Sequence, residues 1–475
     1  MNKNHFLRLT LIAFGATLLA GIAHTAVAAT LCVNPGGSKG CFATIGAAVA
    51  AASPNDTINV GQGTYKEDVI IGKSLSLIGA NQNNTIIDAT GLSNGVYIDG
   101  LDNPGLSSVV VTGFTVKNAN FEGILVTNAS FVTVWGNIVT DNDVNLEPSI
   151  PACPGIPDFE TGEAFDCGEG VHFIGVDHST VANNTVTNNA GGILLSDDTG
   201  QTRDNLVTGN LSKDNPFDCG IVMASHAPGP GSTAPHLGVV RNTIADNEST
   251  HNGFQVPGAG AGVGIFADGS GIGLVSGNVI IHNKLTDNGL PGVAFHSHVG
   301  PTFRLPPDNL NDNIIIGNTI SGNRADLFDT ATPGPTGINI NSGGGGTPIT
   351  GTVISQNVIK GETDDIVVNT PASVDAHLNN LLGKQTGIDA YGGATVDGTE
   401  NWWGCSGGPG ANGCASVSGT GVLSAPWLTS SRPCAMALSG SSQLPPSENE
   451  SGVTLTTPMI SVRLPSSSVR LPRLH

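Results

Sequence analysis

The alternation of apolar and polar positions repeats along the chain as a seven-residue unit in which two Asn residues are separated by four residues. β-Branched residues between Gly and Asn are typical of strands, and each run is too short for a helix. Asn tolerates left-handed backbone angles, which suits a sharp corner. We therefore predict a short strand that ends at a corner in each copy. The copies are GNIVTDN (136–142), NNTVTNN (183–189), GNLSKDN (209–215), RNTIADN (241–247), GNVIIHN (277–283) and GNTISGN (317–323).

A second apolar pattern falls between these copies and begins with Gly. Its members are GILV (123–126), GILL (192–195), GIVM (220–223), GIFA (264–267), GVAF (292–295) and GINI (337–340). The closest copies of the first pattern, at Asn184 and Asn210, are 26 residues apart, whereas Asn137 and Asn184 are 47 apart. Loops inserted into a shorter unit explain that spread.

Short strands repeated at this spacing predict a parallel β-helix, in which stacked coils bury apolar side chains that no single coil can bury. A leucine-rich repeat would need a Leu frame, and this chain offers Gly, Ile and Val instead. Stacked Asn side chains at matching corners should bond to one another as a ladder.

Two segments resemble pectin-lyase-like right-handed β-helices. ATIGAAVAAASPNDTINVGQGTYKEDVIIGKSLSLIGA (43–80) is similar to their N-terminal segment, with 43–52 as a capping helix and GTYKE (63–67) as a turn. NWWGCSGGPGANGC (401–414) looks like their end segment. The resemblance covers about residues 31–430. It implies an all-β fold: a right-handed single-stranded parallel β-helix (solenoid) with a short N-terminal capping helix. It implies little about function, since this superfamily holds lyases, hydrolases, esterases and proteins without known catalysis.

The first residues indicate a secretory signal. Lys3 and Arg8 make a basic start, residues 9–23 are apolar, and Ala26-Val27-Ala28 is an A-x-A cleavage site. No later segment is long and apolar enough to span a membrane. We expect a protein that is secreted, periplasmic or on the cell surface. The expected domains are the signal peptide (1–28), the β-helix (29–430) and a disordered tail rich in Ser and Pro (431–475).

Charge and cysteine content fit that compartment. The formal net charge is -20, and loss of Lys3 and Arg8 with the signal makes it -22. Such acidity argues against nucleic acid as a partner. We expect a monomer whose main partner is a polysaccharide.

Three pairs of Cys are close in sequence and predict local disulfides: Cys32 with Cys41, Cys153 with Cys167, and Cys405 with Cys414. Cys219 and Cys434 are left over.

Candidate chemistry follows the second pattern. Residues at matching positions of stacked strands lie about 4.8 Å apart, so the triplets after each strand should form columns along one sheet edge. His and Asp in such columns can act as general acids and bases or bind a divalent metal such as calcium. Eight of the 12 His lie between residues 172 and 298. The candidate catalytic residues are Asp198, His226, Asp268, His296 and His298.

Each candidate has a plainer alternative. Polar residues at strand ends often only close turns. The insertion 144–169 is either a disulfide-pinned acidic loop, a flap over the cleft or a calcium-binding loop. Trp402 and Trp403 either stack on sugars or cover the last coil. The catalytic signatures of pectin methylesterases and polygalacturonases are missing.

The column lacks Arg and Lys, which favours a neutral glycan or a metal-bridged anionic one over bare pectate. Two functions stay open: a protein that binds, and cleaves or modifies, a polysaccharide along a groove on one sheet, or a non-catalytic scaffold that is adhesin-like or handles metal.

Overall fold

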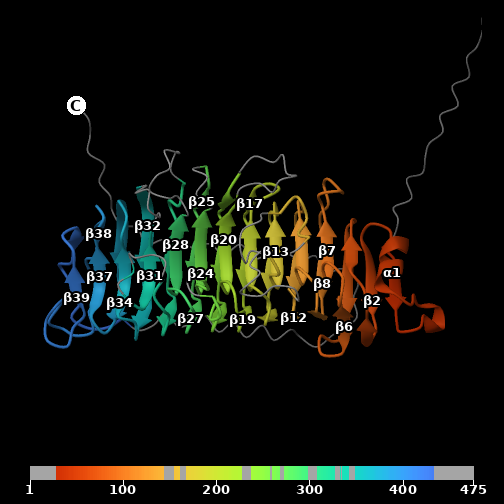
Figure 1. Ribbon diagram of the computed structural model, residues 1–475, viewed down its shortest axis with the longest axis horizontal. Helices are drawn as coiled ribbons and strands as arrows, with labels where there is room; N and C mark the ends of the chain where they lie inside the picture. Colours follow the sequence, from red (N-terminus) through yellow and green to blue (C-terminus); the bar gives the residue numbers. More distant parts are fainter. Residues whose placement is uncertain are drawn as a thin grey trace, which may run out of the picture. The chain divides into compact units, whose positions relative to one another are not determined.

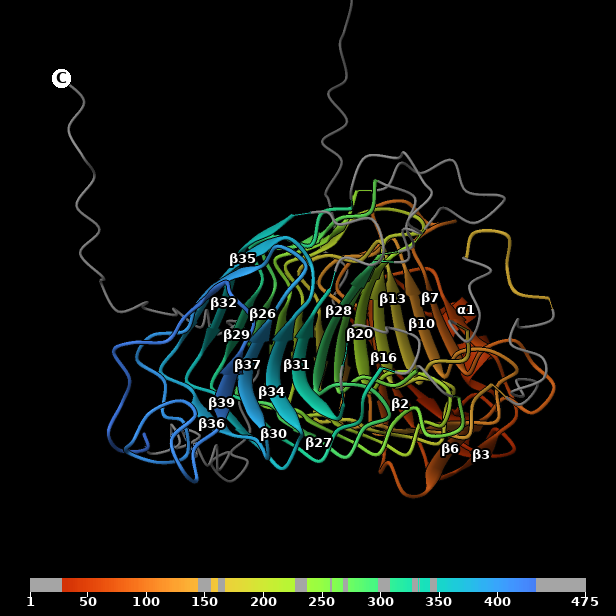
Figure 2. The ribbon, with the colours of Figure 1, turned by 60° about the vertical axis from the view of Figure 1, so that its left-hand side comes forward.

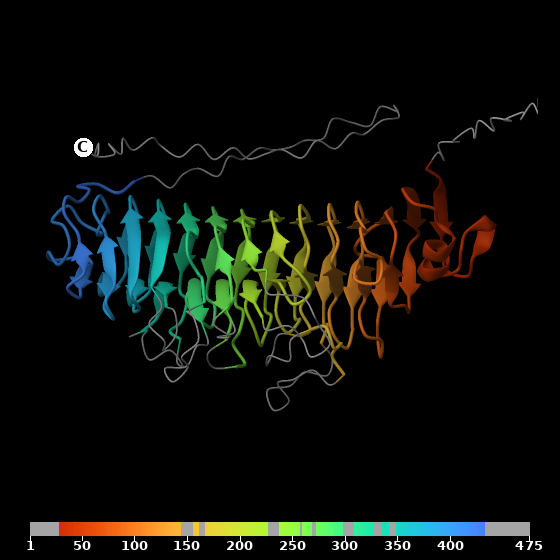
Figure 3. The same ribbon diagram turned by 90° about the horizontal axis from the view of Figure 1, so that it is seen from above.

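The computed structural model describes the chain from residue 28 to 432, with gaps. The described ranges are 28–143, 155–160, 167–226, 237–256, 259–267, 272–297, 308–326, 332, 334–341 and 348–432. Within them, nearly all regular structure is parallel β-strand, and the one α-helix is α1 (Ile45–Ala51). Successive coils stack from α1 to the last strands, as Figure 1 and, from above, Figure 3 show. The predicted right-handed parallel β-helix is confirmed.

Three long sheets make up the walls of the β-helix (Figure 2). Sheet 1 contains 14 described strands. In spatial order these are β1 (Thr30–Val33), β2 (Asp56–Val60), β5 (Leu75–Gly79), β8 (Val110–Thr112), β11 (Thr133–Trp135), β14 (Thr180–Ala182), β18 (Leu206–Thr208), β22 (Thr243–Ala245), β26 (Val279–Ile281), β29 (Ile314–Ile316), β32 (Ile349–Ser355), β35 (Ala372–His377), β38 (Thr395–Asp397) and β40 (Val422–Leu423).

Sheet 2 follows sheet 1 in each coil and contains the strands of four copies of the seven-residue unit, whereas the strands of RNTIADN and GNVIIHN are β22 and β26 of sheet 1. Its described strands are β3 (Gly63–Tyr65), β6 (Thr85–Asp88), β9 (Thr115–Lys117), β12 (Ile138–Thr140), β15 (Thr185–Thr187), β19 (Leu211–Lys213), β23 (Glu248–Thr250), β27 (Lys284–Thr286), β30 (Thr319–Ser321), β33 (Val358–Lys360) and β36 (Asn380–Leu382).

Sheet 3 contains the strands of the second pattern. Its described strands are β4 (Val69–Ile71), β7 (Val96–Asp99), β10 (Ile124–Thr127), β13 (Val171–Ile174), β16 (Ile193–Ser196), β20 (Ile221–Ser225), β24 (Val263–Ala267), β28 (Val293–Ser297), β31 (Thr336–Ile340), β34 (Asp364–Val368), β37 (Thr386–Ala390) and β39 (Ser416–Ser418). A short ribbon between sheets 3 and 1 holds β17 (Thr202–Arg203), β21 (Val239–Val240) and β25 (Val275–Ser276).

The core lies inside the coils. At each inward-facing strand position, the apolar side chains of successive coils stack in a column. In sheet 3, Val171, Ile193, Ile221, Val263 and Val293 are paired in register and fully buried. Side chains alternate between the two faces of a strand, so the residues next to these point outward. That alternation places the polar residues of sheet 3 on its outer face.

A column of Asn side chains, the corner ladder, runs between sheets 1 and 2. Asn247 is typical of its members: its Oδ1 accepts from Asn210 N and Nδ2, both at 3.0 Å. Its Nδ2 donates to Val207 O at 2.9 Å and to Asn283 Oδ1 at 3.0 Å. The preceding Asp246 has a φ of 55° and makes the corner. The predicted ladder is therefore present. Its members are Asn137, Asn184, Asn210, Asn247, Asn283, Asn318, Asn357, Asn379 and Asn401.

The two ends of the solenoid are covered as the sequence predicts. The side chain of Thr44 caps α1, and Glu67 of the GTYKE turn accepts the Ile45 and Gly46 N–H groups, both at 2.8 Å. At the other end Trp403 is fully buried in the core, so it does not stack on sugars. Among the described residues, no helix has the length and apolar character that a membrane crossing requires.

The predicted local disulfides agree with the structure where they are described. Cys32 is bonded to Cys41 and Cys405 to Cys414. Cys167 is also disulfide-bonded, while Cys153 and Cys434 lie outside the described residues.

Candidate functional site

Buried acidic, His and Ser side chains gather around neighbouring strands of sheet 3, and we call this group the sheet 3 cluster. Strands β10, β13, β16 and β20 are neighbours in that order, and they lie side by side in Figure 2. All members are at most 2% exposed. They are Glu122, Glu160, Glu169, His172, Ser196, Asp197, Asp198, Ser225 and His226.

A chain of polar contacts connects three successive coils of the cluster. His172, on the outer face of β13, contacts Ser196 at the end of β16, with Nε2 2.9 Å from Oγ. The Ser196 hydroxyl donates to Asp198 Oδ2 at 2.5 Å. His226, after β20, places its Nδ1 3.4 Å from the same Oδ2. The stacking thus brings together residues 54 positions apart in the sequence.

Asp197 holds the backbone around this chain of contacts. Its Oδ1 accepts His226 N–H at 3.0 Å. Its Oδ2 accepts the Ser225 hydroxyl at 2.9 Å and Gly238 N–H at 2.8 Å. Burial, followed by the charge of Asp198, raises the pKa of Asp197 to about 6 despite these hydrogen bonds. Asp197 therefore positions the coil that carries His226.

Two other carboxyl groups of the cluster have pKa values that are shifted in opposite directions. Burial alone would raise the pKa of Asp198, but the charges of His226 and His172 and hydrogen bonds outweigh it, so that pKa is lowered. Burial and the charges of Glu122 and Asp198 raise the pKa of Glu160 well above its usual value. Asp198 therefore loses its proton more readily than an ordinary Asp, and Glu160 holds its proton more tightly than an ordinary Glu. Such a pair can supply one base and one acid.

Glu122 and Glu169 lie on the other side of His172. Each is followed by one Gly and then by its strand, and Gly123 N–H donates to Glu169 O at 3.0 Å, so the two residues stack. His172 Nδ1 is 3.8 Å from Glu122 Oε1 and 3.9 Å from Glu169 Oε2. One nitrogen and two oxygens therefore converge on the same small region.

The structure places the predicted catalytic residues in different situations. Asp198 and His226 come together, as expected. His296 pairs in register with Phe266 on β24, partly exposed, and its ring meets the Phe266 ring edge-on at 6.2 Å. It therefore shares the column of Ser196 and lies two strands beyond β20. Asp268 and His298 lie outside the described residues.

One predicted alignment was wrong by two residues. The GIFA strand was started at Gly264, whereas Val263 pairs with Ile221 and Val293, so the matching Gly is Gly262. The segment Gly262-Val263-Gly264 offers two possible starts, and only the pairing distinguishes them. The triplet after β24 was therefore assigned to the wrong columns.

Three of the remaining His residues are corner residues. His178, His251 and His282 have φ values of 49°, 58° and 56°, so for them the turn-closing alternative holds. Arg241 pairs with Asp204 at 2.8 Å and Lys284 with Glu248 at 2.7 Å, away from sheet 3.

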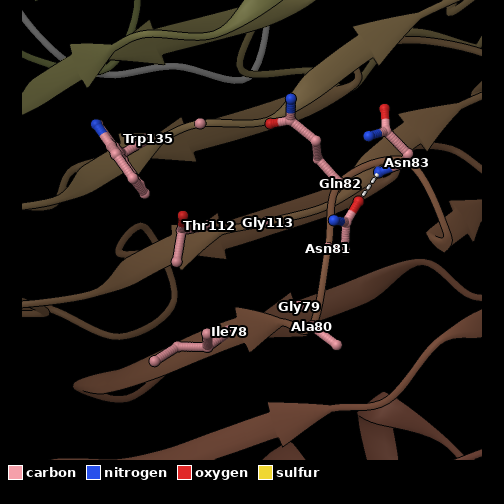
Figure 4. Close-up of a pocket in the computed structure, with 10 residues that line it drawn as sticks. Ile78, Gly79, Ala80, Asn81, Gln82, Asn83, Thr112, Gly113 and Trp135 are labelled. Atoms are coloured by element: carbon pink, nitrogen blue, oxygen red, sulfur yellow. Dashed lines mark hydrogen bonds between the residues drawn. The ribbon is translucent and has the colours of Figure 1, made fainter. Parts of the chain in front are cut away.

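A separate open pocket lies on the outside of sheet 1, near its corner with sheet 2 (Figure 4). Its volume is about 360 Å³, and it is lined by Ile78, Thr112, Trp135 and the turn 79–83. The Trp135 side chain is 48% exposed. An aromatic ring beside amide side chains suits a sugar, but no acid or base lines this pocket.

Comparison with known proteins supports the fold. A family model described as "Right handed beta helix region" matches residues 77–255. No curated protein matches the sequence. The chain is thus a right-handed parallel β-helix repeat protein.

Several solved structures are similar in fold. An alginate lyase from Paenibacillus sp. str. FPU-7 is 11% identical, with a TM-score of 0.40, over 83% of this chain and 99% of that one. The catalytic unit of a GH87 alpha-1,3-glucanase from Streptomyces thermodiastaticus strain HF3-3 is 14% identical, with a TM-score of 0.41, over 82% and 66%. A DFA-IIIase from Arthrobacter chlorophenolicus A6 without its lid is 14% identical, with a TM-score of 0.43, over 84% and 99%. Similarity at this level does not identify the substrate of this chain.

Proposed function

We propose that this protein is an exported, carbohydrate-active β-helix protein that binds a polysaccharide along the outer face of sheet 3 and hydrolyses it at the sheet 3 cluster. The observation that carries the proposal is a pair of buried carboxyl groups, Glu160 and Asp198, that interact electrostatically and have pKa values shifted in opposite directions. Glycoside hydrolysis uses such a pair. Regularly stacked coils also suit a polymer, because they offer successive contacts along the helix axis.

The reaction follows from these two groups. Glu160 gives its proton to the glycosidic oxygen as the bond from that oxygen to the anomeric carbon breaks. Water supplies a hydroxyl group to the anomeric carbon and gives its proton to Asp198. His226 and Ser196 hold the Asp198 carboxylate in place. Both carboxyl groups are at most 1% exposed, so a sugar ring reaches them only when the chain around them opens.

The cluster contains no Arg or Lys, so we propose a neutral polysaccharide as the first substrate to test. Bare polyuronates would bring carboxylates next to Glu122, Asp197 and Asp198 without a protein cation to pair with them.

A non-catalytic scaffold is the second candidate. It is favoured by the complete burial of the cluster and by the three hydrogen bonds that Asp197 makes to neighbouring coils. In that case the cluster would hold coils together, and its residues would matter for stability alone.

One experiment separates the two candidates. The exported protein is incubated with a broad panel of polysaccharides, and new reducing ends are measured for wild type, Asp198→Asn and Glu160→Gln. The matched control is Asp214→Asn, because Asp214 also pairs with a His, His251 at 2.8 Å, but at an exposed corner. We expect each cluster variant to lose at least 100-fold in turnover and the control to keep it. Absence of turnover on the whole panel, or equal turnover in all variants, would favour the scaffold.

Export is part of the proposal. The apparent signal at residues 1–28 and the local disulfides, which persist in oxidising compartments, support it. Mass spectrometry of the protein recovered outside the cytoplasm should show an N-terminus near Ala29. Recovery of the uncleaved chain from the cytoplasm alone would contradict export.

A further inference from the structure

We propose that Glu122, Glu169 and His172 bind a divalent transition-metal cation, with Zn²⁺ as the best representative of the class. The proposal goes beyond the proposed hydrolysis and does not depend on it, because metal binding is measured without any glycan. It rests on the positions of three side chains and on the orientation of one imidazole ring.

The ligand atoms have the right arrangement for one ion. One nitrogen or oxygen from each side chain lies within 4.8 Å of the others. The 3.8 Å and 3.9 Å separations from His172 Nδ1 are too long for hydrogen bonds. Zinc bonds of about 2.1 Å at tetrahedral angles place ligand atoms about 3.4 Å apart. Shifts of about half an ångström would therefore bring His172 Nδ1 to this spacing from each carboxylate oxygen.

The hydrogen bonds of His172 leave its Nδ1 available. Ser196 uses its one hydroxyl proton to donate to Asp198, so its Oγ accepts from His172 Nε2–H. In the neutral ring the proton is thus on Nε2, and the lone pair of Nδ1 faces the two carboxylates. Among the described residues Nδ1 has no hydrogen-bond partner. Metal-binding His residues are fixed in the same way, by a partner on the other ring nitrogen.

The surroundings also favour a cation. Glu122 and Glu169 stack on adjacent coils, and both are fully buried. Glu122 Oε1 accepts only a long hydrogen bond, 3.4 Å, from Gly168 N, and its Oε2 has no hydrogen-bond partner within the described part of the chain. Phe121, which directly precedes Glu122 in the sequence, belongs to an apolar cluster with Cys167 and Phe217. Buried carboxylates in such surroundings are found paired with cations or bound to metals.

The donor set selects the class of metal. Calcium takes oxygen ligands, and an imidazole nitrogen suits zinc, copper, iron or nickel. Three protein ligands leave at least one position for water, as in catalytic zinc sites. We therefore propose zinc-like metals here rather than the calcium expected from the sequence.

The test measures metal on the whole mature protein. Chelator-treated protein is dialysed against Zn²⁺, Mn²⁺ or Ca²⁺, and bound metal is counted by mass spectrometry. We expect about one Zn²⁺ per chain, weaker Ca²⁺ binding and a higher melting temperature with Zn²⁺. His172→Ala and Glu122→Gln should weaken Zn²⁺ binding at least 100-fold. Ser196→Ala, which removes the partner on Nε2, should weaken it 10- to 100-fold.

The matched control is His251→Asn, because His251 is exposed and also lies beside a carboxylate. It should bind Zn²⁺ like wild type. If His172→Ala does not fold, the visible spectrum of Co²⁺ bound to wild type and to Glu122→Gln replaces it, and the spectrum should change. Equal Zn²⁺ binding by the His172 and His251 variants, no bound Zn²⁺, or tighter Ca²⁺ than Zn²⁺ would each overturn the proposal. Loss of glycan turnover alone would not affect it.

Discussion

The corner ladder and the sheet 3 cluster are both groups of buried polar side chains in the same solenoid. They differ in whether all their buried polar atoms have hydrogen-bond partners among the described residues. In the ladder, the amide of Asn247 makes four hydrogen bonds, and no ladder side chain within the described residues has a buried polar atom without a partner. In the cluster, His172 Nδ1, Glu122 Oε2 and both Glu160 oxygens have none among the described residues.

This difference distinguishes buried polar groups that stabilise the fold from buried polar groups that serve a function. Buried polar groups are normally satisfied, and exceptions need an explanation. The ladder has no exceptions and no charge, so it stabilises the stack. The cluster keeps charged groups that burial destabilises, which is expected where a ligand or a reaction completes the site.

The largest expected effect is on the ladder. Asn247→Ala removes four hydrogen bonds and leaves Val207 O and Asn210 N buried without partners. Since each unsatisfied buried group costs about 1–3 kcal/mol, we expect the free energy of unfolding to fall by about 4 kcal/mol. Denaturant unfolding followed by circular dichroism measures this. A loss below about 1 kcal/mol would show that the ladder is not a stabilising element.

The next effect is a pH dependence that the cluster should show and the uncharged ladder should not. The pKa of Asp197 is about 6 in the folded protein against an unfolded value of 3.8, and Asp198 and His226 face it. The folded state therefore binds the proton more tightly, and stability from this group is present below pH 3.8 and is lost as pH rises through 6. The shift corresponds to at most about 3 kcal/mol.

Comparison with Asp197→Asn isolates that contribution. Unfolding curves from pH 4 to pH 7 should show wild type losing stability relative to the variant. Parallel curves would mean that Asp197 does not carry a raised pKa.

A smaller effect of opposite sign is expected at Glu122. Glu122→Gln removes one of two stacked buried carboxylates and keeps an oxygen for Gly168 N–H. In metal-free protein we expect a gain of about 1 kcal/mol, because repulsion and the desolvation of a charge are relieved. Thermal unfolding in chelator measures it. A loss of 2 kcal/mol or more would make Glu122 a structural residue like the ladder Asn.

The smallest effect is expected at a corner His. His251 is 48% exposed and pairs with Asp214, and Asn also tolerates its positive φ. His251→Asn should change the free energy of unfolding by less than about 0.5 kcal/mol. A larger loss would assign the corner ion pair a role in stability.

The fold could be predicted because its determinants repeat. The paired Asn of GNIVTDN and its copies mark the corners, and stacking makes each copy support the next. The contact between Asp198 and His226 followed from the same alignment. The alignment failed at β24, where Gly262 and Gly264 give equal sequence signals and only backbone pairing decides.

Glu122 was missed, and Glu160 and Glu169 were considered only as part of the acidic insertion 144–169, for two physical reasons. Glu122 and Glu169 precede their strands, whereas only residues after the strands were compared. The shared Glu-Gly of FEGILV and GEGVHF was a usable signal. Glu160 belongs to an insertion that has no counterpart in other coils, so no repeat could place it beside Asp198.

The most direct test asks whether the sheet 3 cluster serves catalysis while the corner ladder serves stability. It measures the release of reducing ends per folded molecule by Asp198→Asn and Asn247→Ala, at a temperature where both variants are folded. We predict that Asp198→Asn loses at least 100-fold in turnover while its unfolding midpoint stays near that of wild type. Asn247→Ala should keep wild-type turnover although its midpoint is lowered. Full turnover by Asp198→Asn together with a lowered midpoint would contradict the account, because the sheet 3 cluster would then be a structural element.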